Sequence, residues 1–287
     1  MEWRTRQTGR IPVRERVIAL VVATLAVASA ACSRPAPDPT PPPTPPNLLT
    51  MAAAWKQTAA EYDALYYQGF NLATDRVKQV IQARPASATR SIPLAVIADL
   101  DDTLLDTRGY WRALLADGLE LFDDARWDAW VTANGPTAAP GAITFLQFCH
   151  MANVRVFVVT SRDQGDKTFD IALANIEAAG LPYVERDHLT VVTGGSNKEP
   201  FQADLARTYD VVAYLGDNLN DFKRAYYLTS VESRRTRMAE DQAEFGRKFI
   251  LFPNPTDGHW IRAIVGDSEP KPTNETREAL RRAASGK

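Results

Sequence analysis

Three carboxylates follow directly after an apolar run, in the stretch Ala95-Val96-Ile97-Ala98-Asp99-Leu100-Asp101-Asp102-Thr103. The apolar and β-branched residues predict a strand, so the acidic side chains come where that strand ends. Negative charge crowded at one point costs free energy unless a cation neutralises it, which indicates a divalent metal site. Taken alone, the same run is also compatible with a solvated acidic turn.

Other side chains with useful chemistry follow later apolar runs. Thr160 comes after the run 154–159, and Gly216-Asp217-Asn218-Leu219-Asn220-Asp221 comes after the run 211–215. Lys198 lies in the loop between these runs, at the start of a predicted helix. Each has an ordinary alternative as a helix cap, a tight glycine turn or a solvated lysine. Brought to one place, however, a hydroxyl, a lysine and several carboxylates suit phosphate chemistry.

The elements that must position these groups alternate along the chain. Short apolar runs predict five strands, at residues 94–98, 154–159, 189–192, 211–215 and 249–252. Helical stretches are expected at about 141–152, 165–179, 198–208 and 220–228, with a further helical region from 48 to about 83. This rhythm predicts an α/β fold with a parallel sheet, in which ligands bind beyond the carboxyl ends of the strands.

The residues in these positions resemble the four motifs of the haloacid-dehalogenase-like (HAD-like) superfamily of phosphohydrolases. The matching positions are Asp99-x-Asp101-x-Thr103, Thr160, Lys198, and Gly216-Asp217 through Asp221. More narrowly, the runs 99–106 and 216–222 are similar to those of class C acid phosphatases, the four-aspartate family of outer-membrane lipoprotein 5'-nucleotidases. The resemblance covers roughly residues 50 to 265. It implies a three-layer, Rossmann-like sheet with a smaller helical cap.

The resemblance, together with the needs of phosphomonoester hydrolysis, implies a role for each motif residue. Asp99 is expected to be the nucleophile that forms an aspartyl-phosphate, and Asp101 the general acid and base. The expected cofactor is Mg²⁺, held by Asp99, the backbone carbonyl of Asp101 and Asp217. Thr160 and Lys198 would bind the phosphoryl oxygens.

A supporting role is implied for the last aspartate, and two departures from the family stand beside it. Asp221 is expected to orient Lys198 or a metal-bound water. Asp102 stands where the family usually has Glu, and Ser161 where it often has Asn. Neither departure removes a group that the chemistry needs.

Residues of an insertion at about 106–140, which is rich in aromatic side chains, are expected to determine substrate specificity. Trp127 matches the family position that lines the leaving-group pocket and could stack on a base or aryl group. The family's late loop usually adds a tyrosine, but Asn254-Pro-Thr-Asp257-Gly-His-Trp260 has Asp257 there. We therefore expect hydrolysis of phosphomonoesters including nucleoside 5'-monophosphates, with a strong nucleotide preference in doubt.

Two other functions remain open on the sequence. One is a lipoprotein that binds a small ligand and has lost turnover, although the intact Asp99 and Asp101 argue against it. The other is a phosphotransferase, which would differ only in whether water or an alcohol reaches the intermediate. The scattered His150, His188 and His259 give little support to a histidine phosphatase or a zinc site.

The N-terminus has the layout of an export signal. A basic stretch precedes an apolar run that ends in Ala-Ser-Ala-Ala before Cys32. The run is shorter than a bilayer span and resembles a bacterial lipobox, in which Cys32 becomes lipidated. Ser33 suggests that the anchor is not retained at the inner membrane, so we expect an outer-membrane lipoprotein. A secreted or periplasmic protein is the alternative.

Composition sets the remaining limits. The 287 residues carry a formal net charge of -2, which gives no attraction to a nucleic acid polymer. Two cysteines cannot form a disulfide framework, and the apolar surroundings of Cys149 predict an inert core thiol. The family resemblance also allows a homodimer.

The expected divisions of the chain are a signal peptide (1–31), a Pro-rich linker (32–46), a helical segment (47–92), the phosphatase domain (93–265) and a polar tail or helix (266–287).

Overall fold

The computed structural model describes residues 47–84 and 92–286. The predicted signal peptide, Cys32 and the predicted Pro-rich linker lie outside the described residues. Residues 46–287 form one compact unit. None of the described helices is both long enough and apolar enough to cross a bilayer.

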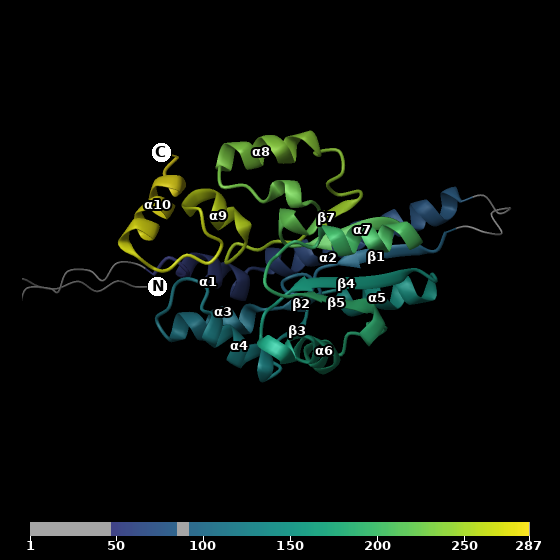
Figure 1. Cartoon of the computed structure of the whole chain (residues 1–287), viewed down its shortest axis with the longest axis horizontal. Coiled ribbons are helices and arrows are strands. Elements are labelled where there is room, and N and C mark those ends of the chain that lie inside the picture. Colours follow the sequence, from purple (N-terminus) through teal and green to yellow (C-terminus); the bar gives the residue numbers. More distant parts are fainter. Residues whose placement is uncertain (1–46, 85–91, 287) are drawn as a thin grey trace, which may run out of the picture. The chain divides into compact units, whose positions relative to one another are not determined.

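A five-stranded parallel sheet forms the centre of the fold, in the order β5-β4-β1-β6-β7. Its strands are β1 (Leu94–Ala98), β4 (Arg155–Ser161), β5 (Leu189–Val192), β6 (Asp210–Gly216) and β7 (Phe249–Leu251). The five predicted strands and their parallel arrangement are therefore confirmed. Figure 1 shows the strands running toward the side of the molecule that carries α1, α3 and α9.

Helices cover both faces of this sheet, which explains why the strands are apolar without alternation. Val96 and Ala98 of β1 join the larger core, beneath α2 (Ala60–Ala83), α5 (Ala142–Met151) and α6 (Thr168–Ala178). Ala95 and Ile97 point the other way, toward α7 (Glu199–Thr208). The result is a three-layer α/β structure, as predicted. Cys149 is buried in the larger core, and burial raises the pKa of its thiol to about 12.

A small helical insertion follows β1. It contains a short antiparallel pair, β2 (Leu105–Asp106) and β3 (Thr137–Ala138), and two helices, α3 (Arg108–Ala116) and α4 (Asp124–Thr132). α1 (Thr50–Thr58) packs on α3 through Leu49, Ala53 and Trp111. The N-terminal helices thus contribute to two places: α1 supports the insertion, and α2 covers the sheet.

The predicted helix at 220–228 is wrong. Two short 3-10 helices, Leu219–Asp221 and Arg224–Tyr226, occupy this stretch, and α8 (Val231–Glu240) follows them. The helical spacing of Phe222 and Tyr226 reflects burial against Phe249 rather than a continuous helix. Side-chain and backbone contacts of Asp221 fix the chain here, so the tertiary structure overrides the local pattern.

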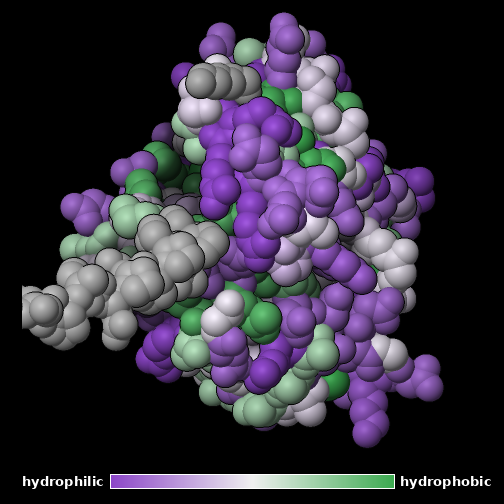
Figure 2. All heavy atoms as spheres, turned by 90° about the vertical axis from the view of Figure 1, so that its left-hand side faces the viewer, coloured by the Kyte–Doolittle hydropathy of each residue, from purple (hydrophilic) through white to green (hydrophobic). Residues whose placement is uncertain are grey.

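The C-terminal region consists of α9 (His259–Val265) and α10 (Asn274–Ala284). No residue of α10 is buried, in keeping with the polar composition of this segment. The side of the molecule that carries these helices is mainly hydrophilic (Figure 2). Arg277 of α10 contacts Glu120 of the insertion, with 2.5 Å between Nη2 and Oε1.

Candidate active site

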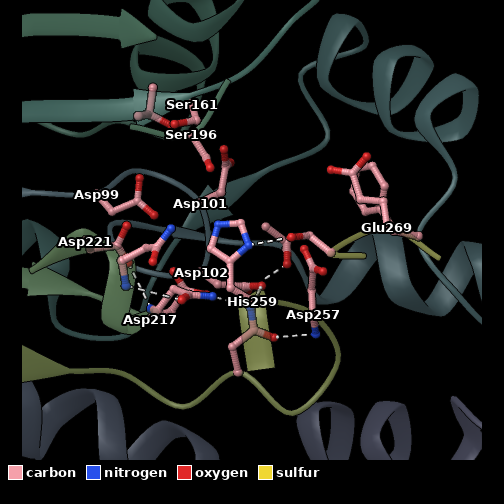
Figure 3. A pocket seen from close by; sticks show the side chains of 18 of the residues that line it. Asp99, Asp101, Asp102, Ser161, Ser196, Asp217, Asp221, Asp257, His259 and Glu269 are labelled. Carbon is pink, nitrogen blue, oxygen red and sulfur yellow. Dashed lines mark hydrogen bonds between the residues drawn. The ribbon is translucent and has the colours of Figure 1, made fainter. Parts of the chain in front are cut away.

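The predicted motif residues meet in one cavity at the carboxyl edge of the sheet. Asp99 and Asp101 follow β1, Thr160 is the last residue but one of β4, Asp217 follows β6, and Lys198 immediately precedes α7. All five line a cavity of about 200 Å³. Three of its aspartates, Asp99, Asp101 and Asp217, are labelled in Figure 3. The parallel sheet therefore joins groups that lie more than a hundred residues apart in the chain.

Three carboxylates form the acidic centre of this cavity. Asp99, Asp217 and Asp221 each place one oxygen so that all three atoms lie within 4.8 Å of one another. Burial raises the pKa of Asp99 to about 6, opposed by Lys198 and reinforced by Asp221. Burial, with Asp221 and Asp99 nearby, holds the pKa of Asp217 well above its ordinary value. Such crowding favours a bound cation, and three hard oxygen donors suit a divalent metal such as Mg²⁺.

Lys198 is the positive group that faces these carboxylates. Its Nζ lies 2.5 Å from Asp99 Oδ1 and donates to Asp221 Oδ1 at 2.7 Å. The two carboxylates raise the pKa of Lys198 although its burial lowers it. The lysine therefore stays charged inside the cavity. Asp221 thus contacts Lys198 directly, and its predicted orienting role stays a prediction.

Gly216 is required by packing rather than by an unusual backbone angle. The sequence suggested a tight glycine turn, but the φ of Gly216 is not positive. A Cβ atom at this position would lie 2.4 Å from the Cβ and Oδ2 atoms of Asp221. Asp221 Oδ2 in turn accepts a hydrogen bond from the Asn218 backbone N–H at 2.8 Å. The missing side chain thus leaves the room in which Asp221 reaches Lys198.

Arg162 is a site residue that the sequence did not indicate. Its guanidinium donates two hydrogen bonds to Asp101, from Nε at 2.7 Å and from Nη2 at 2.6 Å. A third bond, from Nη1 to Asn175 Oδ1 at 2.8 Å, fixes the arginine from behind. Burial raises the pKa of Asp101, while Arg162 lowers it. The only sequence signal was the place of Arg162, two residues after Thr160.

Lys56 is a second residue that the sequence did not indicate. This fully buried side chain of α1 donates from Nζ to both carboxylate oxygens of Asp102, each at 2.9 Å. It also donates to Thr256 Oγ1 at 3.1 Å. Asp102 has a left-handed backbone with φ 51°, and the Tyr66 hydroxyl donates to its carbonyl oxygen at 2.6 Å. The loop that carries Asp99 and Asp101 is thus held from below by α1 and α2.

Asn254 connects this support to the acidic centre. Its Nδ2 donates to Asp102 Oδ2 at 3.0 Å and to Asp217 Oδ2 at 2.7 Å. The amide therefore holds one of the proposed metal ligands in position. For Lys56, the sequence offered one signal of burial. Lys56 lies three residues after Ala53, on the same face of the helix as this buried residue. The family resemblance placed Asn254 in the family's late loop but predicted no contact with Asp102 or Asp217.

The outer part of the cavity combines aromatic and acidic side chains. Trp111, Phe122 and Trp127 come from the insertion, and Asp257 and Glu269 come from the C-terminal region. Phe122 and Trp127 contact each other with ring centroids 5.7 Å apart. The structure places Trp127 at the cavity wall, and its predicted contact with the leaving group stays a prediction.

Comparison with known proteins agrees with this fold and this cavity. Residues 44–260 match the family described as HAD superfamily, subfamily IIIB (Acid phosphatase), and the chain belongs to that family. It is a phosphomonoester hydrolase of the acid phosphatase type.

Two solved structures are similar to it over most of the chain. The class C acid phosphatase from Bacillus anthracis has 31% sequence identity and a TM-score of 0.73, with 82% of this chain and 95% of that chain covered. The same enzyme with tungstate bound has 29% identity and a TM-score of 0.74, with the same coverage.

Proposed function

We propose that this chain is an Mg²⁺-dependent acid phosphatase that works through an aspartyl-phosphate on Asp99. The observation that carries the proposal is the cluster of Asp99, Asp217 and Asp221 with the Lys198 ammonium against it. Asp99, the carbonyl of Asp101 and Asp217 are the proposed metal ligands, with Asp221 adjacent. Bound Mg²⁺ would supply the positive charge that lets an anionic phosphoryl group approach a carboxylate.

The chain's own residues account for both halves of the reaction. An Asp99 oxygen attacks phosphorus as the bond to the leaving oxygen breaks, and Asp101 donates a proton to that oxygen. Asp101 then accepts a proton from the water that attacks the phosphoryl group, which releases phosphate and restores Asp99. Lys198 and Thr160 hold the phosphoryl oxygens. Protonation of Asp101 weakens the two hydrogen bonds from Arg162, because a neutral carboxyl is a weaker acceptor than a carboxylate.

Nucleoside 5'-monophosphates are proposed to be among the substrates. Trp127 and Phe122 offer aromatic surface at the outer cavity wall, against which a base can stack. The presence of Asp257 on the facing loop argues for a broader range of phosphomonoesters.

Metal removal tests the catalytic proposal. In EDTA, we expect the full chain in detergent to release p-nitrophenol from p-nitrophenyl phosphate at least about 100-fold more slowly than in Mg²⁺. Added Mg²⁺ should restore the rate, and AMP and CMP should also be hydrolysed. An undiminished rate in EDTA would contradict metal dependence. No turnover under any condition would favour the ligand-binding lipoprotein, and transfer of phosphate to an added alcohol would favour a phosphotransferase.

We further propose that Cys32 carries a lipid that anchors the enzyme to the cell envelope, at the outer membrane. The support is the signal-like run before Cys32 and the prolines after it, both features of the sequence. We expect the Cys32→Ala variant to move from the membrane fraction to the soluble fraction with its phosphatase activity intact. Cys149→Ala serves as the matched control and should stay in the membrane fraction. Retention of the Cys32→Ala variant in the membrane would refute the anchor.

A further inference from the structure

The outer cavity contains two carboxylates without a basic partner. Asp257 and Glu269 both line the cavity, and Figure 3 shows the Asp257 carboxylate directed into it. Within residues 47–84 and 92–286, no ion pair includes either side chain. The basic groups of the inner cavity are already engaged, because Lys198 contacts Asp99 and Asp221. Negative charge at the outer end is therefore left for a ligand to neutralise.

The loop around Asp257 is held firmly. Asn254 Oδ1 accepts hydrogen bonds from the backbone N–H groups of Thr256 and Asp257, each at 3.2 Å. The indole Nε1 of Trp260 donates to the Asp257 carbonyl at 2.8 Å. Burial raises the pKa of Asp257 to about 6, with Asp102 and Asp101 adding to the rise. A partly desolvated carboxyl on a fixed loop gains from a cationic partner.

Basic groups farther out do not fill this role. Arg224 and Arg262 stack on Tyr227, with their guanidinium carbons 3.5 and 4.3 Å from its ring centroid. His259 lines the cavity, but burial and the nearby Arg234 lower the pKa of its imidazole to about 3, so the ring is neutral. Asp257 and Glu269 thus face a cavity without a free positive charge among these neighbours.

The aromatic wall adds an environment that favours cations. Trp127 and Phe122 line this wall, and the guanidinium carbon of Arg162 already lies 5.6 Å from the centroid of the Trp127 ring. Ring faces attract cations through their quadrupole, and most strongly when water is excluded. Carboxylates and ring faces in one cavity form a combination that recognises ammonium groups.

We propose that the enzyme prefers phosphomonoesters whose alcohol carries an ammonium group, with Asp257 and Glu269 as its ionic partners and Trp127 and Phe122 around it. This inference rests on the proposed function, because the reacting phosphoryl group at Asp99 fixes where the leaving group lies. Asp257 is the specificity-determining residue. Glu269 contributes less, since it is exposed to solvent.

A matched substrate pair tests the proposal. Phosphocholine is compared with its uncharged isostere, in which a tert-butyl group replaces the trimethylammonium group. In Mg²⁺, we expect the full chain to favour phosphocholine by about tenfold in kcat/KM, the size of one desolvated cation contact. Asp257→Asn should reduce this ratio to within about twofold of unity, and Glu269→Gln should lower it less. Because the two substrates share one shape, the ratio cancels any common loss of activity.

The control variant is Asp187→Asn. It removes one exposed carboxylate at the amino end of β5, outside the cavity, and should keep the tenfold ratio. A wild-type ratio near unity, or an unchanged ratio in Asp257→Asn, would overturn the inference while p-nitrophenyl phosphate is still hydrolysed. Failure to hydrolyse any phosphomonoester would instead overturn the proposed function.

Discussion

Asp99→Asn should abolish turnover of p-nitrophenyl phosphate, with kcat lower by at least about 10⁴-fold. The asparagine keeps the shape of the side chain but lacks the carboxylate that attacks phosphorus. It also removes one of three crowded negative charges, so the variant should unfold at a temperature no lower than that of the wild type. Steady-state kinetics and a thermal melt check the two expectations together.

A trapping experiment separates loss of the nucleophile from damage to the site. When the wild type is quenched in acid during turnover, intact-protein mass spectrometry should show one added phosphoryl group, and Asp99→Asn should show none. Asp210→Asn is the matched control, because this exposed aspartate lies at the opposite, amino end of β6. The control should resemble the wild type. A residual rate above about one per cent of wild type in Asp99→Asn would place the nucleophile elsewhere.

Lys56→Met is expected to lower the free energy of unfolding by about 3–5 kcal/mol, because it leaves Asp102 buried without its ionic partner. The apolar methionine retains most of the volume of the side chain. Activity should also fall, since Asp102 directly follows Asp101 and shares Asn254 with Asp217. Denaturant unfolding measures the stability, and kcat in saturating Mg²⁺ measures the displacement of the site.

The matched control is Lys78→Met, because the Lys78 side chain is 53% exposed and pairs only loosely with Asp75. It should change the stability by less than about 1 kcal/mol. Adding Asp102→Asn to Lys56→Met should recover part of the loss, since asparagine is neutral and tolerates the left-handed backbone at this position. If Lys56→Met and Lys78→Met have equal effects, the buried pair does not support the catalytic loop.

The fold and the central motif residues could be predicted from the sequence because they depend on local signals. Buried parallel strands are continuous apolar runs, and the residues after them meet at one edge of the sheet. Asp99, Asp101, Thr160, Lys198 and Asp217 therefore converge without any knowledge of side-chain contacts. The aromatic insertion could likewise be located by composition, although its two helices could not be bounded.

Other features were decided only by the tertiary structure. The stretch 220–228 has helical spacing, yet contacts of Asp221 with Lys198 and Gln202 fold it into short 3-10 turns. The energies of such long-range contacts exceed the small local preference for a helix.

Lys56 and Arg162 are site residues whose roles could not be predicted from the sequence, for the same reason. A lysine or arginine in a sequence is normally a surface residue, and its burial depends on the carboxylate that meets it in space. Lys56 lies 46 residues from Asp102, and Arg162 lies 61 residues from Asp101. The sequence by itself determined which chemistry is present at the strand ends. The tertiary structure decided which charges support it, because a buried ion pair forms only where folding brings both partners together.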